Sequence, residues 1–180
     1  MNLTNKQQCW IKELEELWNF FDTRLKGYSL NSDDLRLKLL LTMTIAIHRL
    51  IRGFLAQLRG GSNDNLQSKL RTLTEAFINV RYILSDDTDS RAKAFVLDSK
   101  KIRIKRLNNI IRLVEQGEAS SKAAVGSIES YIELRESLRQ EVSEEENRLG
   151  ESSLSWPPVE QRARQAGLEE YYPTVFYLFS

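Results

Sequence analysis

The sequence has little of what disulfide-rich or turn-rich proteins need: one cysteine, three prolines and eight glycines in 180 residues. Cys9 cannot form a disulfide within the chain, and the first residues, MNLTNKQQCW, are polar and unlike a secretory signal. Both absences favour the reducing cytoplasm. The few glycines and prolines disfavour an all-β protein, because its many turns depend on these residues.

Catalytic and metal-binding motifs are also scarce. The lone histidine, His48, supplies neither a catalytic triad nor a histidine metal cluster. No CxxC, HExxH, Walker or dinucleotide motif is present, and neither are the Glu-x-x-His pairs of carboxylate metal sites in helical bundles. We therefore expect no cofactor and no metal, and we expect His48 to be packed or to face Asp or Glu. Whether the chain is an enzyme stays open.

Excess charge and long apolar runs are missing too. The formal net charge is +1, which gives no bulk reason to bind nucleic acid. The most apolar run, LLLTMTIAI, covers only residues 39–47, whereas a helix that spans a membrane needs about 20 apolar residues. We therefore predict a buried central helix here and no membrane association.

Apolar residues recur at three- and four-residue intervals, and no strand alternation stands out. This spacing predicts one all-α domain over 1–180, an up-and-down bundle of five main helices and a short C-terminal one. The main helices are expected at about 5–26, 33–58, 65–84, 90–116 and 123–149. Ser32 is the expected N-cap of the second helix, and Pro157 and Pro158 open the short helix that Gly167 ends.

The last ten residues, YYPTVFYLFS, are strongly apolar, although chain ends are usually polar unless they dock. Two interpretations stay open. Either this tail packs back onto the bundle, or the chain is truncated inside a longer element.

A polar stripe runs along the predicted third helix, where Arg71, Glu75 and Asn79 follow one another at four-residue steps. The larger apolar arc is expected to be the core face, and its members are Leu66, Leu70, Leu73, Phe77, Val80 and Leu84. Apolar residues also border the stripe on both sides: Ile78, Tyr82, Ala76 and Ile83. Because a solvated face is rarely bordered in this way, we expect the stripe to be covered in the fold or in an oligomer.

Three interpretations of the stripe stay open. It can be a surface ion pair with a nearby asparagine, which stabilises little. It can be a structural buried network at a helix junction, since buried charges persist only when they are paired. It can also be a catalytic or ligand site formed by Arg71, Glu75 and Asn79.

A basic stretch, SKKIRIKR at 99–106, lies in the predicted fourth helix. Its cations are Lys100, Lys101, Arg103, Lys105 and Arg106. Lys100 and Arg103 fall within or beside the apolar arc, so their stems lie along apolar surface or their charges meet a neighbouring helix, with Glu75 as a candidate partner. The stretch can also bind phosphates of RNA, but no aromatic residue interleaves with it, and the acidic run EVSEEE can neutralise it.

Two segments resemble a family of uncharacterised bacterial proteins, domain of unknown function 5677. They are LRTLTEAFINVRYILSDD with the following RAKAF, and SWPPVEQRARQAGLEEYYPTVFYLFS. That family is similar to the HEPN-like helical bundles, which recur in toxin–antitoxin and antiviral defence proteins. The resemblance therefore implies an HEPN-like bundle.

The resemblance also marks individual positions. They are Arg71, Glu75, Asn79, Tyr82, Arg91, Trp156, Tyr171, Tyr177 and Ser180. Tyr82 and Arg91 are thus candidates for a polar network. Two departures matter: HEPN ribonucleases carry an arginine followed within about six residues by a histidine, which this chain lacks, and the family continues past the position of Ser180 to a histidine.

Two functions follow as hypotheses. The first is a non-catalytic helical interaction module in bacterial defence or a toxin–antitoxin system, as a homodimer or with a partner protein. The second is a ribonuclease or RNA-binding protein. In that case Glu75 acts as general base, Arg71 stabilises developing negative charge, and the five basic residues hold phosphates.

Overall fold

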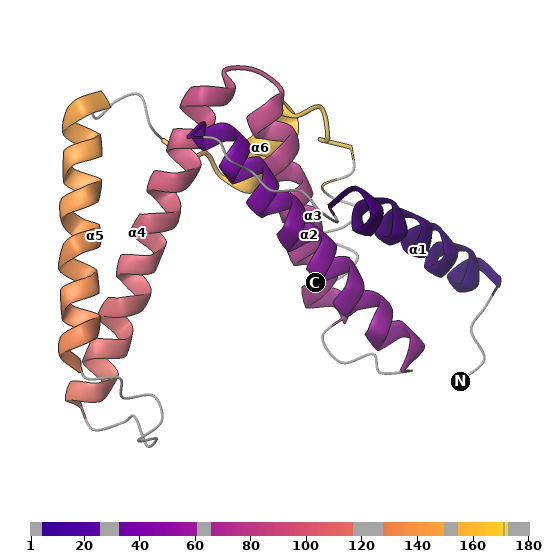
Figure 1. The fold of residues 1–180 in the computed structure, drawn as a ribbon, viewed down its shortest axis with the longest axis horizontal. Helices are drawn as coiled ribbons and strands as arrows, with labels where there is room; N and C mark the ends of the chain where they lie inside the picture. The colour runs from indigo at the N-terminus through magenta and orange to yellow at the C-terminus, as the bar shows by residue number, and fades with distance from the viewer. Residues whose placement is uncertain are drawn as a thin grey trace. The chain divides into compact units, whose positions relative to one another are not determined.

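The structure is a computed structural model, and it describes residues 5–25, 33–60, 66–116, 128–149, 155–170 and 172. These residues form six α-helices and no strand (Figure 1). The helices are α1 (Asn5–Leu25), α2 (Leu35–Arg59), α3 (Leu66–Leu84), α4 (Thr88–Glu115), α5 (Ile128–Leu149) and α6 (Val159–Gln165). The predicted all-α class, with five long helices and a short C-terminal one, is confirmed.

The chain divides into two compact units. The first, 1–88 with 157–180, contains α1, α2, α3 and α6; the second, 89–156, contains α5 and all of α4 after its first residue. The single domain over 1–180 stays a prediction.

The start of α2 is fixed by Asp34, whose side chain accepts a hydrogen bond from the backbone N–H of Arg36 at 2.9 Å. An N-terminal helix turn has backbone N–H groups without helical partners, and a carboxylate at the N-cap satisfies one of them. The prediction that Ser32 is this cap is wrong; Ser32 itself lies outside the described residues.

Helix α2 is the centre of the first unit, where it packs against both α1 and α3. Its buried residues are Met43, Ile51 and Leu55. It is also the helix, within the described ranges, that is long and apolar enough to cross a membrane, although core helices and signal sequences share those properties. The absence of membrane association stays a prediction.

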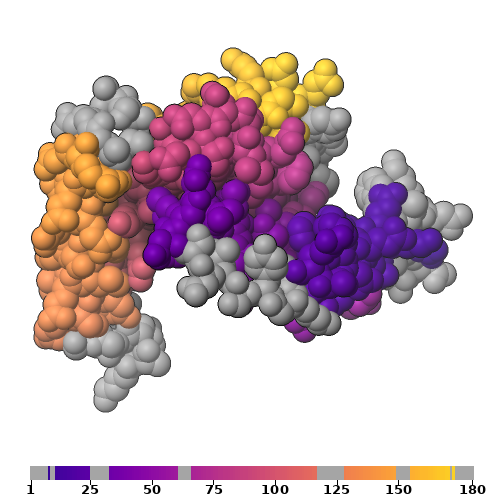
Figure 2. All heavy atoms as spheres, turned by 45° about the horizontal axis from the view of Figure 1, so that its top comes forward, coloured from indigo at the N-terminus to yellow at the C-terminus, as the bar shows by residue number. Residues whose placement is uncertain are grey.

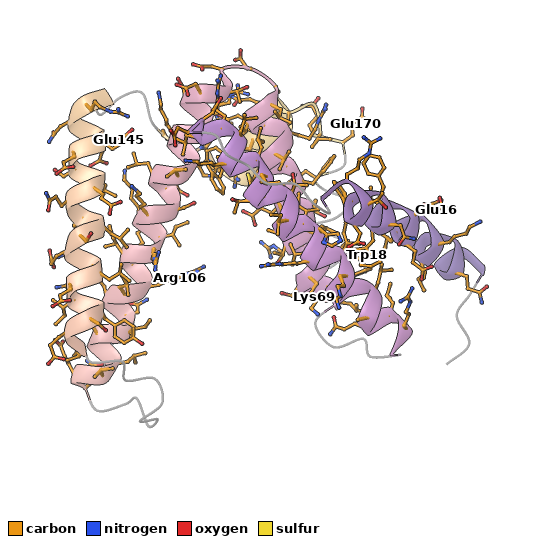
Figure 3. All side chains as sticks on the ribbon, viewed as in Figure 1. Glu16, Trp18, Lys69, Arg106, Glu145 and Glu170 are labelled. Atoms are coloured by element: carbon orange, nitrogen blue, oxygen red, sulfur yellow. The ribbon has the colours of Figure 1, made fainter. Side chains whose placement is uncertain are left out.

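Trp18 on α1 stacks on His48 of α2, with ring centroids 5.4 Å apart and planes 10° from parallel. Figure 3 shows Trp18 on the side of α1 that faces α2. The Nε2 atom of His48 lies 3.8 Å from Oδ1 of Asp22. The prediction that His48 is packed or faces Asp or Glu is therefore confirmed.

The expected core face of α3 is partly wrong. Phe77 and Leu84 are 50% and 52% exposed, whereas the buried residues of α3 are Ile78, Tyr82 and Ile83. These three border the polar stripe, and α6 packs against α3. The larger apolar arc was not the buried one, because the short helix α6 and the segment after it pack against Ile78 on the side of the stripe.

In the second unit α4 and α5 run antiparallel, side by side (Figure 1). Nζ of Lys100 lies 2.7 Å from Glu141, and Nζ of Lys101 lies 2.6 Å from Glu146. Apolar residues are buried on both helices: Leu97, Leu107 and Ile111 on α4, Leu138 and Val142 on α5. This unit is an ion-paired helical hairpin.

Candidate functional site

Helix α6 places one arginine against α3. Val159, Arg162, Ala163 and Ala166 recur at three- and four-residue steps, so they share one face of α6. Ala163 is 0% and Arg162 5% exposed, and Val159 packs with Ile78 of α3. The surface of α6 and its following residues, yellow in Figure 2, adjoins the magenta atoms of α3. The guanidinium of Arg162 is therefore buried in the contact between α6 and α3, among apolar side chains.

Arg162 bonds to two members of the polar stripe. Its Nη1 donates to Oδ1 of Asn79, and its Nη2 donates to Oε1 of Glu75 at 3.3 Å. A buried cation without partners would cost several kcal/mol, and these two acceptors offset part of that cost for Arg162. Asn79 is half-buried, whereas the side chain of Glu75 is 44% exposed and Arg71 is exposed. The junction therefore covers the stripe near Asn79 and leaves its Arg71 end at the surface.

A second carboxylate, Glu160, lies on α6 beside this junction. The hydroxyl of Tyr172 donates to Oε1 of Glu160 at 2.6 Å. This hydrogen bond, with smaller contributions from the positive charges of Arg162 and Arg71, lowers the pKa of Glu160 below its ordinary value of 4.5. Two arginines and two glutamates, one of each from α3 and α6, thus form an ionic cluster around the contact.

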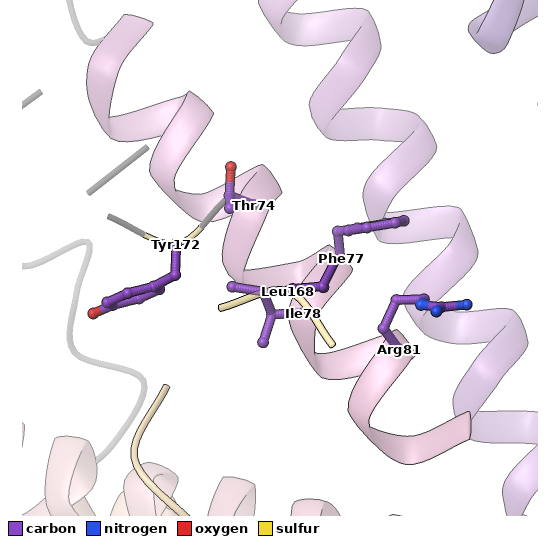
Figure 4. A pocket seen from close by; sticks show the side chains of 6 residues that line it. All are labelled: Thr74, Phe77, Ile78, Arg81, Leu168 and Tyr172. Carbon is purple, nitrogen blue, oxygen red and sulfur yellow. The ribbon is translucent and has the colours of Figure 1, made fainter. Parts of the chain in front are cut away.

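An apolar hollow of about 460 Å³ adjoins the same contact (Figure 4). It is lined by Thr74, Phe77, Ile78 and Arg81 from α3 and by Leu168 and Tyr172 from the segment after α6. Among the described residues, no group of His, Cys, Asp and Glu is arranged to hold a metal ion. The site therefore consists of an ion pair and hydrogen bonds between α3 and α6, with an apolar hollow beside them.

The remaining residues marked by the family resemblance belong to both units or lie outside the described residues. Tyr82 is buried on α3, and Arg91 lies half-buried in the first turn of α4. The ring of Trp156 packs edge-on against Phe95, with centroids 5.1 Å apart in the second unit. Tyr171, Tyr177 and Ser180 lie outside the described residues.

The basic stretch is divided into two sets. Lys100 and Lys101 pair with glutamates of α5, as the acidic run allowed, so Glu75 is not the partner of Lys100. Glu75 pairs with Arg162. The other three cations, Arg103, Lys105 and Arg106, are exposed, and none of the described residues forms an ion pair or hydrogen bond with their side chains.

Sequence reasoning did not single out Arg162, Glu160 or Tyr172. For Arg162 a local signal existed: it is the charged member of an otherwise apolar three- and four-residue pattern, Val159 to Ala166. A charge at such a position must find a partner on the element that the helix packs against. No comparable signal marks Glu160 or Tyr172, whose contact depends on the turn after α6.

Comparison with known proteins identifies the family. The model of the family of unknown function DUF5677 matches residues 37–180, which include the stripe of α3, the basic stretch of α4 and Arg162 of α6. No curated protein and no solved structure is similar enough to match the chain. Because the match covers most of the sequence, the chain belongs to the family of unknown function DUF5677.

Proposed function

We propose that this chain is a non-catalytic helical interaction module. One observation carries the proposal: Glu75 and Asn79, which are two of the three candidate catalytic residues, are acceptors for the buried Arg162 and fasten α6 to α3. A general base needs a lone pair directed at substrate, and the contact with Arg162 engages one of the two carboxylate oxygens of Glu75, Oε1. These contacts support a structural role for Glu75 and Asn79.

The partner is a second copy of the chain or another protein. Large exposed apolar side chains that share one side of a helix support this, because apolar patches commonly mark binding sites. Phe77 and Leu84 are seven residues, about two turns, apart on α3, and both are exposed. Our finer proposal is an HEPN-like bundle that acts in the bacterial cytoplasm, in defence or a toxin–antitoxin system. It rests on the similarity of the family to HEPN-like bundles, and the all-helical fold agrees with it.

Light scattering of the purified chain tests the dimer. We expect a mass of two chains at high micromolar concentration and dissociation on dilution, since modest apolar surfaces give moderate affinity. A monodisperse monomer at every concentration would exclude the homodimer. The remaining proposal would then be a complex with a different protein.

A second candidate, a ribonuclease or RNA-binding protein, is favoured by one observation. Arg71 is exposed, and almost half of the Glu75 side chain is accessible. Incubation with mixed labelled RNA, without metal, beside the Glu75→Gln variant decides between the two functions. The interaction module predicts intact RNA with both proteins. Cleavage by the parent chain alone would replace the module with a ribonuclease.

A further inference from the structure

One side of α4 faces α5. Lys100 and Lys101 are ion-paired with Glu141 and Glu146, and Leu107 and Ile111 are buried. With 100° per residue, Ile102 and Arg106 project on the side opposite Ile111. Figure 3 shows Arg106 directed away from α5. A second face of α4 therefore points away from α5 and is exposed.

This outward face of α4 is both apolar and cationic. It consists of Ile102, Arg103, Lys105, Arg106 and Ile110. Ile102 is 42% and Ile110 38% exposed, and all three cations are exposed without an ion-pair partner in the part of the chain that is described. No Asp or Glu occurs between residues 99 and 114, so the face has charge of one sign.

We infer that the outward face of α4 binds an acidic amphipathic helix of a partner protein. Ile102 and Ile110 are eight residues apart, about 12 Å along the axis, which matches the spacing of apolar residues two turns apart on a partner helix. Carboxylates on either side of that apolar strip meet Arg103, Lys105 and Arg106. The inference rests on the proposed interaction module and names the chemistry of its partner.

Other occupants fit less well. The second unit of another copy would present α4, whose cations repel those of this face, or the outward side of α5. On that side of α5 Glu133, Gln140 and Glu144 are exposed, and no large apolar side chain of the described residues is. RNA would gain nothing from the two isoleucines and would find no aromatic side chain on this face to stack its bases. It would also lose two of the five expected phosphate contacts, because Lys100 and Lys101 pair with α5.

The test uses the whole chain and three fluorescent probes in anisotropy titrations. The first probe is a peptide of about three heptads with leucines on one face and glutamates elsewhere; the second replaces every glutamate with lysine; the third is a polyuridine of about 12 nucleotides. The protein variants are Arg106→Glu, Ile110→Ser and, as a matched control, Arg52→Glu, which reverses an exposed charge on α2. Far-UV circular dichroism checks that each variant is folded.

We expect the acidic peptide to bind with a dissociation constant below about 100 µM, about tenfold weaker to Arg106→Glu and about fivefold weaker to Ile110→Ser. Arg52→Glu binds like the parent chain, and the lysine peptide does not bind. No binding of the acidic peptide at this concentration overturns the inference, as does equal binding of the lysine peptide.

The RNA probe separates this inference from the proposed function. If polyuridine binds more tightly than the acidic peptide and Arg106→Glu abolishes that binding, the face is a nucleic-acid site and both proposals fail. If neither probe binds while the chain still self-associates, the inference fails and the interaction module stands.

Discussion

Arg162 on α6 and Asn79 on α3 are joined by a hydrogen bond from Nη1 to the amide Oδ1, across 83 residues of chain. Glu75, one turn earlier on α3, accepts from Nη2 of the same guanidinium. Because Arg162 is 5% exposed, water cannot replace these acceptors. The geometry therefore makes the position of α6 dependent on two polar residues of α3.

Replacing Glu75 tests this dependence. Glu75→Ala removes an acceptor from a buried cation and should lower the free energy of unfolding by about 2 to 3 kcal/mol. Glu75→Gln keeps an oxygen acceptor and should lower it by about 1 kcal/mol. Urea denaturation followed by circular dichroism measures both. Glu133→Ala, at an exposed position of α5, is the control and should change stability by less than about 0.5 kcal/mol. Equal losses for Ala and Gln would contradict a hydrogen-bonded role.

Local pattern was enough to predict the helices and the unusual stripe, but not the element that meets it. The stripe stood out because Arg71, Glu75 and Asn79 repeat at helical spacing between apolar borders. Its partner Arg162 lies on a seven-residue helix far along the chain, and no periodicity links distant segments. The core face of α3 was mispredicted for the same reason, since burial depends on what packs against a helix as well as on its own apolar count.

Glu160 and Tyr172 predict a pH dependence. The folded-state pKa of Glu160 is lowered, chiefly by the Tyr172 hydroxyl, so this contact stabilises the fold above about pH 4.5 and stops doing so as the pH falls through the lowered pKa. Tyr172→Phe should therefore be less stable than the parent chain near pH 6, and the difference should shrink under acid. Urea denaturation at several pH values between about 3 and 6 measures it. A difference that stays constant across this range would exclude a titrating carboxylate as the cause.

Asp34 gives a second acid-sensitive contact, at the start of α2. Hydrogen bonds from the side chain and backbone of Arg36 lower the pKa of Asp34 from 3.8 to about 2. Its stabilising effect is therefore complete above pH 3.8 and is lost as the pH falls towards 2. Asp34→Ala should lower the melting temperature at pH 7, whereas Asp34→Asn, which keeps an N-cap acceptor, should lower it less. Scanning calorimetry measures the melting temperature of both variants. Identical values would show that an N-cap acceptor at position 34 does not stabilise α2.

The hairpin of the second unit can be tested by exchanging charges. Lys101→Glu or Glu146→Lys alone places like charges together and should destabilise the α4–α5 contact by about 0.2 to 1 kcal/mol. The double variant restores an ion pair with reversed polarity and should recover most of this loss. A double-mutant cycle by urea denaturation isolates the coupling, and added salt should reduce it. Additive losses would mean that the two charges do not interact in solution.

The contact between His48 and Trp18 is expected to stabilise the fold through ring packing more than through hydrogen bonding. Their rings stack, and neither His48 Nε2 nor Trp18 Nε1 has a hydrogen-bond partner in the described parts of the chain. His48→Phe keeps an aromatic ring against Trp18 and removes a buried nitrogen, so stability should be unchanged or higher. His48→Ala leaves a cavity between α1 and α2 and should lower the free energy of unfolding by about 2 to 4 kcal/mol. Urea denaturation followed by tryptophan fluorescence compares the two variants. A large loss for His48→Phe would instead show that the imidazole itself is needed, with Asp22, at 3.8 Å, as the group that requires it.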